Sequence, residues 1–173
     1  MIEPIVMVSL VVVLFSAMCS DIRSSRIPNW ITLTAMGFAL FLHAWFDGVP
    51  GALFSLGGLV TGLGLFLFFY LSGGIGAGDV KLMAAVGAMV GPYGAVMSCL
   101  LAILVGGVYA LGAMIYEWGI ITTGQKLAFT VKTTFLPGDK AVQNLALPFR
   151  LRYGVAIVGG TILFMLGLHP FRG

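Results

Sequence analysis

Hydrophobic residues run along this chain in long blocks, separated by short clusters of polar residues, glycine and proline. Clusters of this kind mark where one element ends and the next begins. Five blocks are about 16 to 22 residues long, near the roughly 17 to 25 residues that a helix needs to cross a bilayer. The fourth block has only eleven residues. The six blocks run from Pro4 to Ser20, Trp30 to Phe46, Gly51 to Leu71, Val80 to Val90, Ala95 to Tyr116 and Tyr153 to Leu168.

The short fourth block allows two interpretations. As a helix it rises only about 16 Å, against a hydrocarbon core of about 30 Å. Either it is a short helix that starts below the membrane surface, or the helix continues through the break at Gly91-Pro92-Tyr93-Gly94. In the first case Asp79, which stands just before the block, lies in a recess.

Composition makes this an integral membrane protein. Of its 173 residues, 60% are hydrophobic and 9% are charged, with a mean hydropathy of +1.08, which excludes an ordinary water-soluble domain. The first block follows Glu3 and no lysine or arginine, so it is expected to be a retained span and not a signal peptide. We expect an all-α, polytopic membrane protein with about six transmembrane helices, forming a single domain over residues 1–173.

Lysine and arginine are distributed unevenly between the blocks. With alternating spans, the connections after the first, third and fifth blocks share one side of the membrane and hold eight of the nine basic residues. The positive-inside rule predicts that this side is cytoplasmic and that the N-terminus is outside. Asp21 and Asp79 then share the cytoplasmic face. The eight residues are Arg23, Arg26, Lys81, Lys126, Lys132, Lys140, Arg150 and Arg152.

Two aspartates stand at the edges of apolar blocks, in a chain with only six acidic residues. Asp21 could belong to an ordinary charged loop, and Asp79 could be a helix N-cap. Carboxylates placed where burial is costly are nevertheless expected to have a chemical role. Gly76 and Gly78 fit a tight turn before the fourth block, and they let the backbone approach another segment closely. Two carboxylates at one membrane face suggest acid/base chemistry.

Metal chemistry has no support in the sequence. Cys19 and Cys99 lie 80 positions apart inside apolar blocks, so neither a disulfide framework nor a Cys-x-x-Cys site is available. We expect both to be buried as small hydrophobic residues. His43 and His169 are far from any candidate nucleophile and are expected to be interfacial or packed polar residues. No metal and no cofactor are therefore expected.

The polar stretch from Glu117 to Arg152 is open to two interpretations. Its lysines alternate with apolar residues, as in an amphipathic segment that lies on anionic lipid. A docking surface for the substrate or for another protein would have the same pattern.

Three segments resemble the type IV prepilin peptidases, in the short form of tight-adherence pilus systems. They are Asp21 through Asn29, Gly76 through Ala85 and Tyr153 through Gly159. The resemblance implies an intramembrane aspartic endopeptidase of the G-x-G-D class, with Asp21 and Asp79 as the catalytic pair in a recess at the cytoplasmic face of the bacterial inner membrane. It implies Gly76 and Gly78 as a supporting turn, with further support from Arg26, Pro28, Asn29, Lys81, Tyr153 and Gly154.

The same resemblance implies the partners. The substrate is expected to be a prepilin or pseudopilin whose leader peptide is removed, and the other partner is the lipid bilayer, with no nucleic acid. Longer family members carry a four-cysteine zinc region associated with N-methylation. This chain enters the membrane by residue 4 and has no Cys-x-x-Cys, so we expect peptidase activity alone. The identity of the pilin and the oligomeric state are left open.

Two carboxylates suffice for amide hydrolysis without a metal. One acts as a base that deprotonates water and the other as an acid, and like charges a few ångströms apart favour sharing one proton. Three alternatives stay open. A preflagellin peptidase would use the same chemistry on another substrate. A transporter would need acidic residues midway through a span, and a scaffold would tolerate Asp-to-Asn changes.

Overall fold

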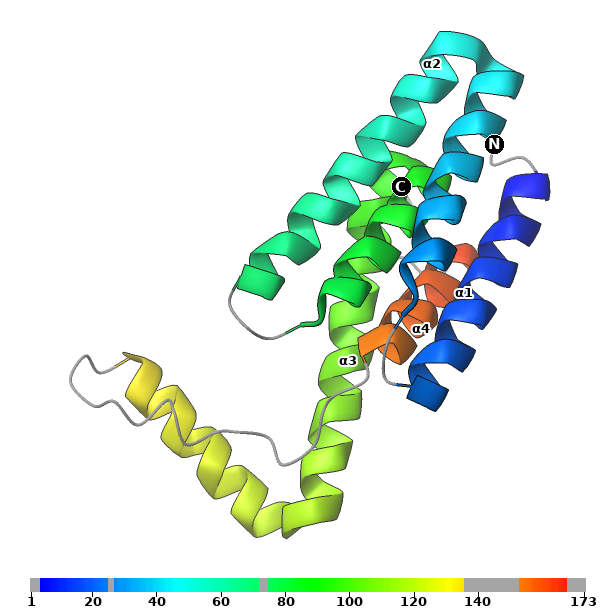
Figure 1. Cartoon of the computed structure of the whole chain (residues 1–173). Coiled ribbons are helices and arrows are strands. Elements are labelled where there is room, and N and C mark those ends of the chain that lie inside the picture. The colour runs from blue at the N-terminus through cyan, green and yellow to red at the C-terminus, as the bar shows by residue number, and fades with distance from the viewer. Residues whose placement is uncertain (1–3, 25–26, 72–74, 136–152, 168–173) are drawn as a thin grey trace. The chain divides into compact units, whose positions relative to one another are not determined.

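The computed structural model describes residues 4–24, 27–71, 75–135 and 153–167, with side chains up to residue 125 in the third range. These residues form helices and no strand, which confirms the expected all-α class. The helices are α1 (Pro4–Ser24), α2 (Asn29–Leu71), α3 (Ala77–Phe135) and α4 (Tyr153–Met165) (Figure 1).

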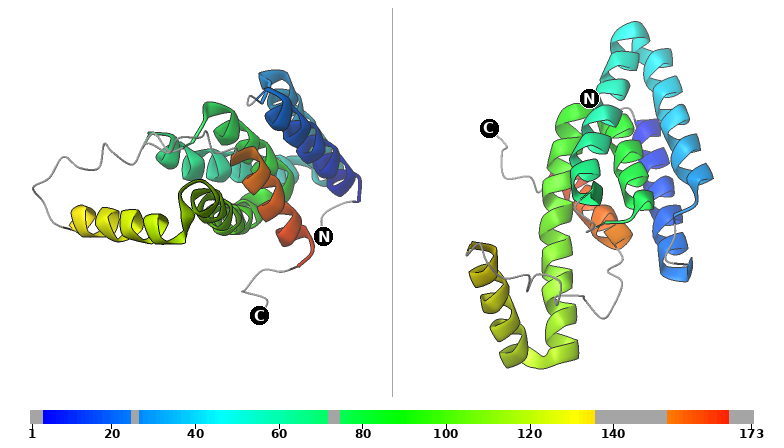
Figure 2. Two further views of the ribbon diagram at one scale, coloured as in Figure 1. Left: turned by 90° about the horizontal axis from the view of Figure 1, so that it is seen from below. Right: turned by 60° about the vertical axis from the view of Figure 1, so that its left-hand side comes forward.

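The chain forms two compact units, and α3 contributes to both. One unit combines Met1–Gly106 with Arg152–Gly173, and the other is Gly107–Leu151. In the first unit α1 contacts both α2 and α4, as the views in Figure 2 also show. All three segments that carried the resemblance belong to this unit.

Helix α2 consists of two arms joined at a kink. Gly48 has φ 64° and ψ −142°, a left-handed conformation that interrupts the helix, and Pro50 follows directly. The chain doubles back at this point (Figure 1). The two arms, residues 29–47 and 49–71, correspond to the second and third predicted blocks.

Helix α3 is interrupted in the same way. Gly91 has φ 77°, so residues 77–90 form a short first arm, after which the chain doubles back (Figure 1). Fourteen residues rise about 21 Å, less than the roughly 30 Å of a hydrocarbon core. The block is therefore a short helix, as the first of the two interpretations expects, and its start below the membrane surface stays a prediction.

This short arm is the centre of the first unit. An arm that is apolar on all sides is expected to be buried on all sides, and its side chains are indeed almost fully enclosed. Those with no more than 4% exposure are Leu82, Met83, Ala84, Ala85, Val86, Ala88, Met89 and Val90. Side chains of α1, α2 and α4 complete the same core cluster, among them Leu10, Phe66 and Ile157.

Glycines allow the second arm of α2 to approach this short arm at backbone distance. A Cβ on Gly58 would collide with the carbonyl oxygen of Gly87, and a Cβ on Gly87 would collide with that of Gly58. Gly62 faces the backbone of Met83 in the same manner. Small residues at such crossings bring helices close together and favour association in membranes.

The end of the short arm is completed by side chains from α2. Pro92 has no N–H to offer the carbonyl of Ala88, and Ser55 Oγ donates to that carbonyl at 2.9 Å instead. His43 Nε2 donates to the carbonyl of Met89 at 3.1 Å. Both side chains are buried, so neither carbonyl is left unsatisfied in apolar surroundings. The expectation that His43 is a packed polar residue is confirmed, whereas His169 lies outside the described residues.

Two predicted boundaries are wrong in a way that matters for the site. Helix α1 continues to Ser24 rather than ending at Ser20, so Asp21 lies inside the helix and not after it. Helix α3 begins at Ala77, so Asp79 lies in its first turn and not before it. Hydropathy marks the edge of the apolar surface, whereas backbone hydrogen bonding extends the helix beyond that edge.

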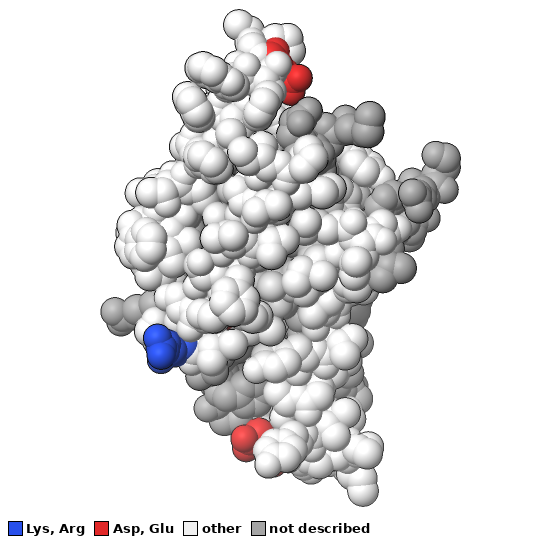
Figure 3. Space-filling view, turned by 90° about the vertical axis from the view of Figure 1, so that its right-hand side faces the viewer, with Lys and Arg blue, Asp and Glu red and all other residues white. Residues whose placement is uncertain are grey.

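Within the described part of the chain, three helices are long and apolar enough to cross a membrane. They are α1, α2 and residues 77–125 of α3; α4 is apolar but has 13 residues. Most of the face drawn in Figure 3 carries no charge. The chain is therefore a membrane protein, and the number of about six spans stays a prediction.

The expected burial of the cysteines is half right. Cys99 is buried, but Cys19 is exposed. Cys19 lies on the same face of α1 as the exposed residues Val8, Val12 and Phe15, which is opposite the stripe that packs against the other helices. An apolar side chain on that face is suited to contact lipid.

The second unit has its own interruption of α3. Gly119 has φ 77°, and the buried Thr123 donates from Oγ1 to the carbonyl of Met114 at 3.1 Å. The side chains of the lysines in the polar stretch lie outside the described residues, so both interpretations of that stretch stay open.

The crossing at Gly58 generates a stability prediction. Gly58→Ala should lower the thermal unfolding midpoint of the purified protein in detergent, with a loss of about 1–3 kcal/mol, because overpacking costs that much. Gly64→Ala is the matched control on the same arm, since a Cβ there meets nothing within 4 Å. It should be neutral or slightly stabilising. An unchanged midpoint for Gly58→Ala would contradict the backbone contact.

Candidate active site

Asp21 continues the buried stripe of α1. The buried positions of this helix are Val6, Leu10, Leu14, Ala17 and Asp21, a spacing of three and four residues that keeps them on one face. Asp21 exposes only 6% of its surface. The same periodicity that packs α1 against the other helices therefore turns this carboxylate inward.

Asp79 is held by the glycine turn before α3. The N–H of Asp79 donates to the carbonyl of Gly76 at 3.0 Å, and Asp79 Oδ2 accepts a hydrogen bond from the N–H of Gly76 at 3.2 Å. The second bond is one half of a capping box, in which the side chain of the third helical residue reaches back to the N–H of the N-cap, while the first is made by the backbone carbonyl because Gly76 has no side chain. Asp79 therefore caps the start of α3, as the N-cap interpretation expects, but it does so from the first turn of the helix and not from the N-cap position. The bond uses only one carboxylate oxygen.

Gly78 brings the α3 turn against the chain that follows α1. A Cβ on Gly78 would lie 3.3 Å from Ile27 Cβ and 3.5 Å from Ile27 N. Ile27 itself is buried. The lack of a side chain at Gly78 therefore lets the segment after Asp21 lie directly on the turn that carries Asp79.

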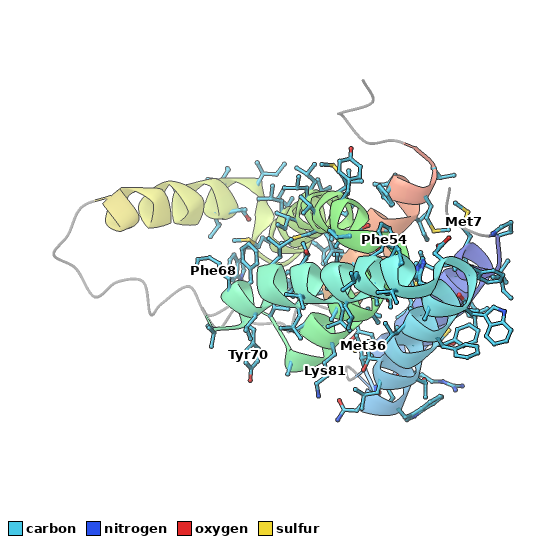
Figure 4. The ribbon with its side chains drawn as sticks, turned by 90° about the horizontal axis from the view of Figure 1, so that it is seen from above. Met7, Met36, Phe54, Phe68, Tyr70 and Lys81 are labelled. Atoms are coloured by element: carbon cyan, nitrogen blue, oxygen red, sulfur yellow. The ribbon has the colours of Figure 1, made fainter. Side chains whose placement is uncertain are left out.

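A side-chain hydrogen bond joins the same two segments. Lys81 Nζ donates to Asn29 Oδ1 at 2.9 Å. Asn29 is the first residue of α2, whose opening turn is stabilised by a hydrogen bond from the N–H of Ile31 to the carbonyl of Pro28 at 3.1 Å. Figure 4 shows the Lys81 side chain pointing out of the helix bundle. This pair therefore lies at the rim of the site.

The first turn of α4 forms a third side of the site. A Cβ on Gly154 would lie 2.6 Å from Asp21 Oδ2 and 3.0 Å from Asp21 Cγ, so the backbone of α4 faces the carboxylate directly. The neighbouring residue, Tyr153, is half-buried. It lies within electrostatic range of the Asp79 carboxylate.

The two carboxylates are brought together from helices that are 58 positions apart in the chain. Asp21 and Asp79 lie close enough for their charges to repel each other. Of the residues that the resemblance adds to this pair, the described ones belong to the three segments that meet here, and Arg26 lies outside the described residues. The described ones are Gly76, Gly78, Pro28, Asn29, Lys81, Tyr153 and Gly154.

Such a pair can carry out acid/base chemistry. Two like charges in proximity disfavour double ionisation, which favours a state in which the pair holds a single proton. One group can then accept a proton while the other donates one. Within the described ranges, no three histidine, cysteine or acidic side chains come together in a way that could hold a metal ion. Metal independence stays a prediction.

These features define a helical membrane protein with two carboxylates held together where helix ends meet. A sequence model of the type IV leader peptidase family matches residues 8–111, well over half of the chain, and the chain belongs to this family. It is therefore a peptidase. Comparisons with curated protein sequences and with solved structures gave no match.

The sequence alone missed three contributors to the site. Ile27 supplies the surface on which the glycine turn rests, and Ser55 and His43 complete the far end of the helix that carries Asp79. A polar residue inside an apolar block is the signal that could have identified His43 and Ser55. Nothing in the sequence distinguishes Ile27 from other apolar residues.

The contact at Gly78 generates a prediction. Gly78→Ala should insert into the membrane normally, because Ile27 needs to move by only a few tenths of an ångström. Peptidase activity should fall by up to roughly tenfold, less than the roughly hundredfold loss that a displacement of a reacting group by about 1 Å can cause, because the expected shift is smaller. Cleavage of a co-expressed substrate, normalised to protein level by blot, measures the effect.

The control for this prediction is Gly37→Ala, since a Cβ at Gly37 meets nothing within 4 Å. This variant should cleave like the unmodified protein. If the bulkier Gly78→Val also cleaves at the normal rate, the turn is only a connector.

Proposed function

We propose that this peptidase is an intramembrane aspartic endopeptidase that removes the leader peptide of type IV prepilins or pseudopilins. The observation that carries the proposal is the proximity of Asp21 and Asp79, which reach one site from α1 and α3. The family match includes both residues. Asp21 is buried in an otherwise apolar stripe, where a carboxylate has no evident structural advantage.

The reaction follows from the two carboxylates. The ionised group takes a proton from water as the water oxygen attacks the carbonyl carbon of the scissile peptide bond. The protonated group donates its proton to the carbonyl oxygen. As the carbon–nitrogen bond then breaks, the group that took the proton from water gives it to the leaving nitrogen, and a hydroxyl of the tetrahedral gem-diol intermediate returns its proton to the other carboxylate, so the pair again holds one proton. Neither a metal nor a covalent intermediate takes part.

The location of the pair supports cleavage close to the membrane surface. Asp21 lies in the last turn of α1 and Asp79 in the first turn of α3. Arg23 and Lys81 follow them by two residues each, and Lys81 is at the rim of the site. Water can reach such helix ends, whereas the middle of a span is dry.

The orientation we propose is N-terminus outside, with the site at the cytoplasmic face of the bacterial inner membrane. The positive-inside rule favours it, because the connections on the side of the aspartates hold most of the lysines and arginines. Asp47, which precedes the kink at Gly48, is placed on the far side. The absence of N-methylation activity stays a prediction.

The catalytic pair generates the central prediction. Asp21→Asn and Asp79→Asn should each abolish leader removal, because neither variant can share a proton between two carboxylates. The double variant should be scarcely worse than either single one, since groups that act as a unit are strongly non-additive. The measurement is the fraction of a co-expressed prepilin that is shortened on a gel, with membrane levels of each variant checked by blot.

Asp47→Asn is the matched control for the pair and should process the prepilin normally. Should Asp79→Asn accumulate in the membrane and still process the substrate, the aspartic mechanism fails, and a scaffold or transporter role takes its place. If the unmodified protein cleaves a preflagellin but no prepilin, the chemistry stands and the substrate class is wrong.

The orientation generates a separate prediction. Single-cysteine proteins, with Cys19 and Cys99 replaced by alanine, should carry the remaining cysteine as Asp47→Cys or Lys132→Cys. A membrane-impermeant thiol reagent applied to intact spheroplasts should label only the Asp47→Cys protein. Labelling of the Lys132→Cys protein under these conditions would contradict the proposed orientation, and its labelling after lysis serves as the control for reactivity.

A further inference from the structure

The first turn of α4 has contacts with the site that the family match does not explain. Tyr153 and Gly154 lie outside the matched residues 8–111. Even so, Gly154 is buried, and its missing side chain is what leaves room for the Asp21 carboxylate. A residue reached only after the whole matched region thus shapes the environment of one of the two aspartates.

The three glycines of α4 differ in what they face. A Cβ on Gly160 would meet the backbone of Ala102, and a Cβ on Gly159 would lie 3.2 Å from Val105 Cγ1. Both contacts are packing contacts with α3. Gly154 alone of the three faces a carboxylate, at 2.6 Å from Oδ2. Glycine is less favourable than alanine in a helix, and the space that the Asp21 carboxylate needs explains a glycine at position 154.

The atoms that a Cβ would meet determine what the substitution does. The nearest atoms are Oδ2, Cγ and Cβ of Asp21, and the first two belong to the end of a side chain that can rotate. Asp21 Cβ, at 3.3 Å, is fixed to the backbone of α1, so this backbone needs to shift by only a few tenths of an ångström. An alanine at position 154 is accommodated by turning the carboxylate, which changes its orientation toward Asp79 while the fold is retained.

Tyr153 fixes the position of this turn. A Cβ on Gly106 of α3 would lie 3.3 Å from Ala156 Cβ, 3.8 Å from Tyr153 Cε1 and 3.9 Å from Tyr153 Cδ1, so Ala156 and the tyrosine ring both pack on the surface that Gly106 leaves open. Gly154 lies between these two residues in α4. The ring contact therefore contributes, with that of Ala156, to holding Gly154 beside Asp21.

We propose that the first turn of α4 is a positioning element of the active site. The backbone at Gly154 sets the orientation of the Asp21 carboxylate, and the ring of Tyr153 anchors this turn on α3. The proposal rests on the proposed function in one respect, which is that Asp21 is catalytic. It adds that the turnover rate depends on the absence of a Cβ at residue 154.

The first experiment separates turnover from substrate binding. The full-length protein in detergent is assayed with a purified prepilin at several concentrations. Gly154→Ala should lower kcat by about tenfold or more, with KM changed by less than about twofold, because it displaces a reacting group and not the substrate. Gly159→Ala is the matched control on the same helix, since its Cβ meets only the side chain of Val105; it should keep both constants.

The tyrosine is tested by a conservative variant. Tyr153→Phe keeps the ring and should retain most of the activity, whereas Tyr153→Ala removes the anchor and should lower kcat. An inactive Tyr153→Phe would overturn the positioning role, because the hydroxyl would then take part in the chemistry. A Gly154→Ala protein with raised KM and normal kcat would likewise overturn it, since residue 154 would then contact the substrate.

A second experiment tests the contact without any activity. Thermal unfolding midpoints are measured for Gly154→Ala, Asp21→Ala and the double variant. If the added Cβ meets the Asp21 carboxylate, removing that carboxylate should relieve the effect of Gly154→Ala, so that the two changes are coupled in the double-mutant cycle. Strict additivity would overturn the proposal even if Gly154→Ala proves poorly folded.

The two proposals fail in different ways. If Asp21→Asn still cleaves prepilin, the proposed function fails, while the coupling between residues 21 and 154 can still be observed. If Asp21→Asn is inactive but Gly154→Ala cleaves at the normal rate, the proposed function stands and the positioning role of α4 is overturned.

Discussion

The structure depends on how one short helix ends inside apolar surroundings. Residues 77–90 carry Asp79 at their beginning and stop at Gly91, before they could cross a full bilayer. Backbone carbonyls that end a helix in a dry environment must find donors, and Ser55 and His43 provide them to Ala88 and Met89. Because a helix is stiff along its axis, fixing this end also fixes the depth at which Asp79 begins the other end.

Glycine serves two different purposes in the same unit. At Gly58 and Gly87 the absence of side chains allows two helices to meet backbone to backbone, which is a matter of stability. At Gly78 and Gly154 it allows a backbone to approach the segment after Asp21 or the Asp21 carboxylate itself. The first pair determines where the short arm lies, and the second pair determines how the two carboxylates face each other.

The sequence was most informative where chemistry and hydropathy conflict. Asp21 and Asp79 stand out because carboxylates are rare beside apolar blocks, and the length of the fourth block raised a short helix as one of two interpretations. Helix bounds were less predictable, since the polar residues from Ser20 to Ser24 continue α1 although they leave its apolar surface. Long-range contacts could not be predicted at all. The hydrogen-bond partner of Ser55 and the approach of Gly154 to Asp21 depend on how the helices pack. A single sequence does not specify that packing.

The burial of Asp21 explains why the site needs several helices. A carboxylate in the buried stripe of α1 loses hydration, and its neighbour Asp79 adds repulsion rather than attraction. Neither the loss of hydration nor the charge repulsion favours the folded state. The surrounding contacts must therefore hold the two carboxylates together. Those contacts come from helix segments rather than from long loops: the turn at Gly76, the rim pair of Lys81 and Asn29, and the first turn of α4. Groups fixed on helices are held more precisely than groups on loops, and the proposed sharing of one proton between two carboxylates requires that precision.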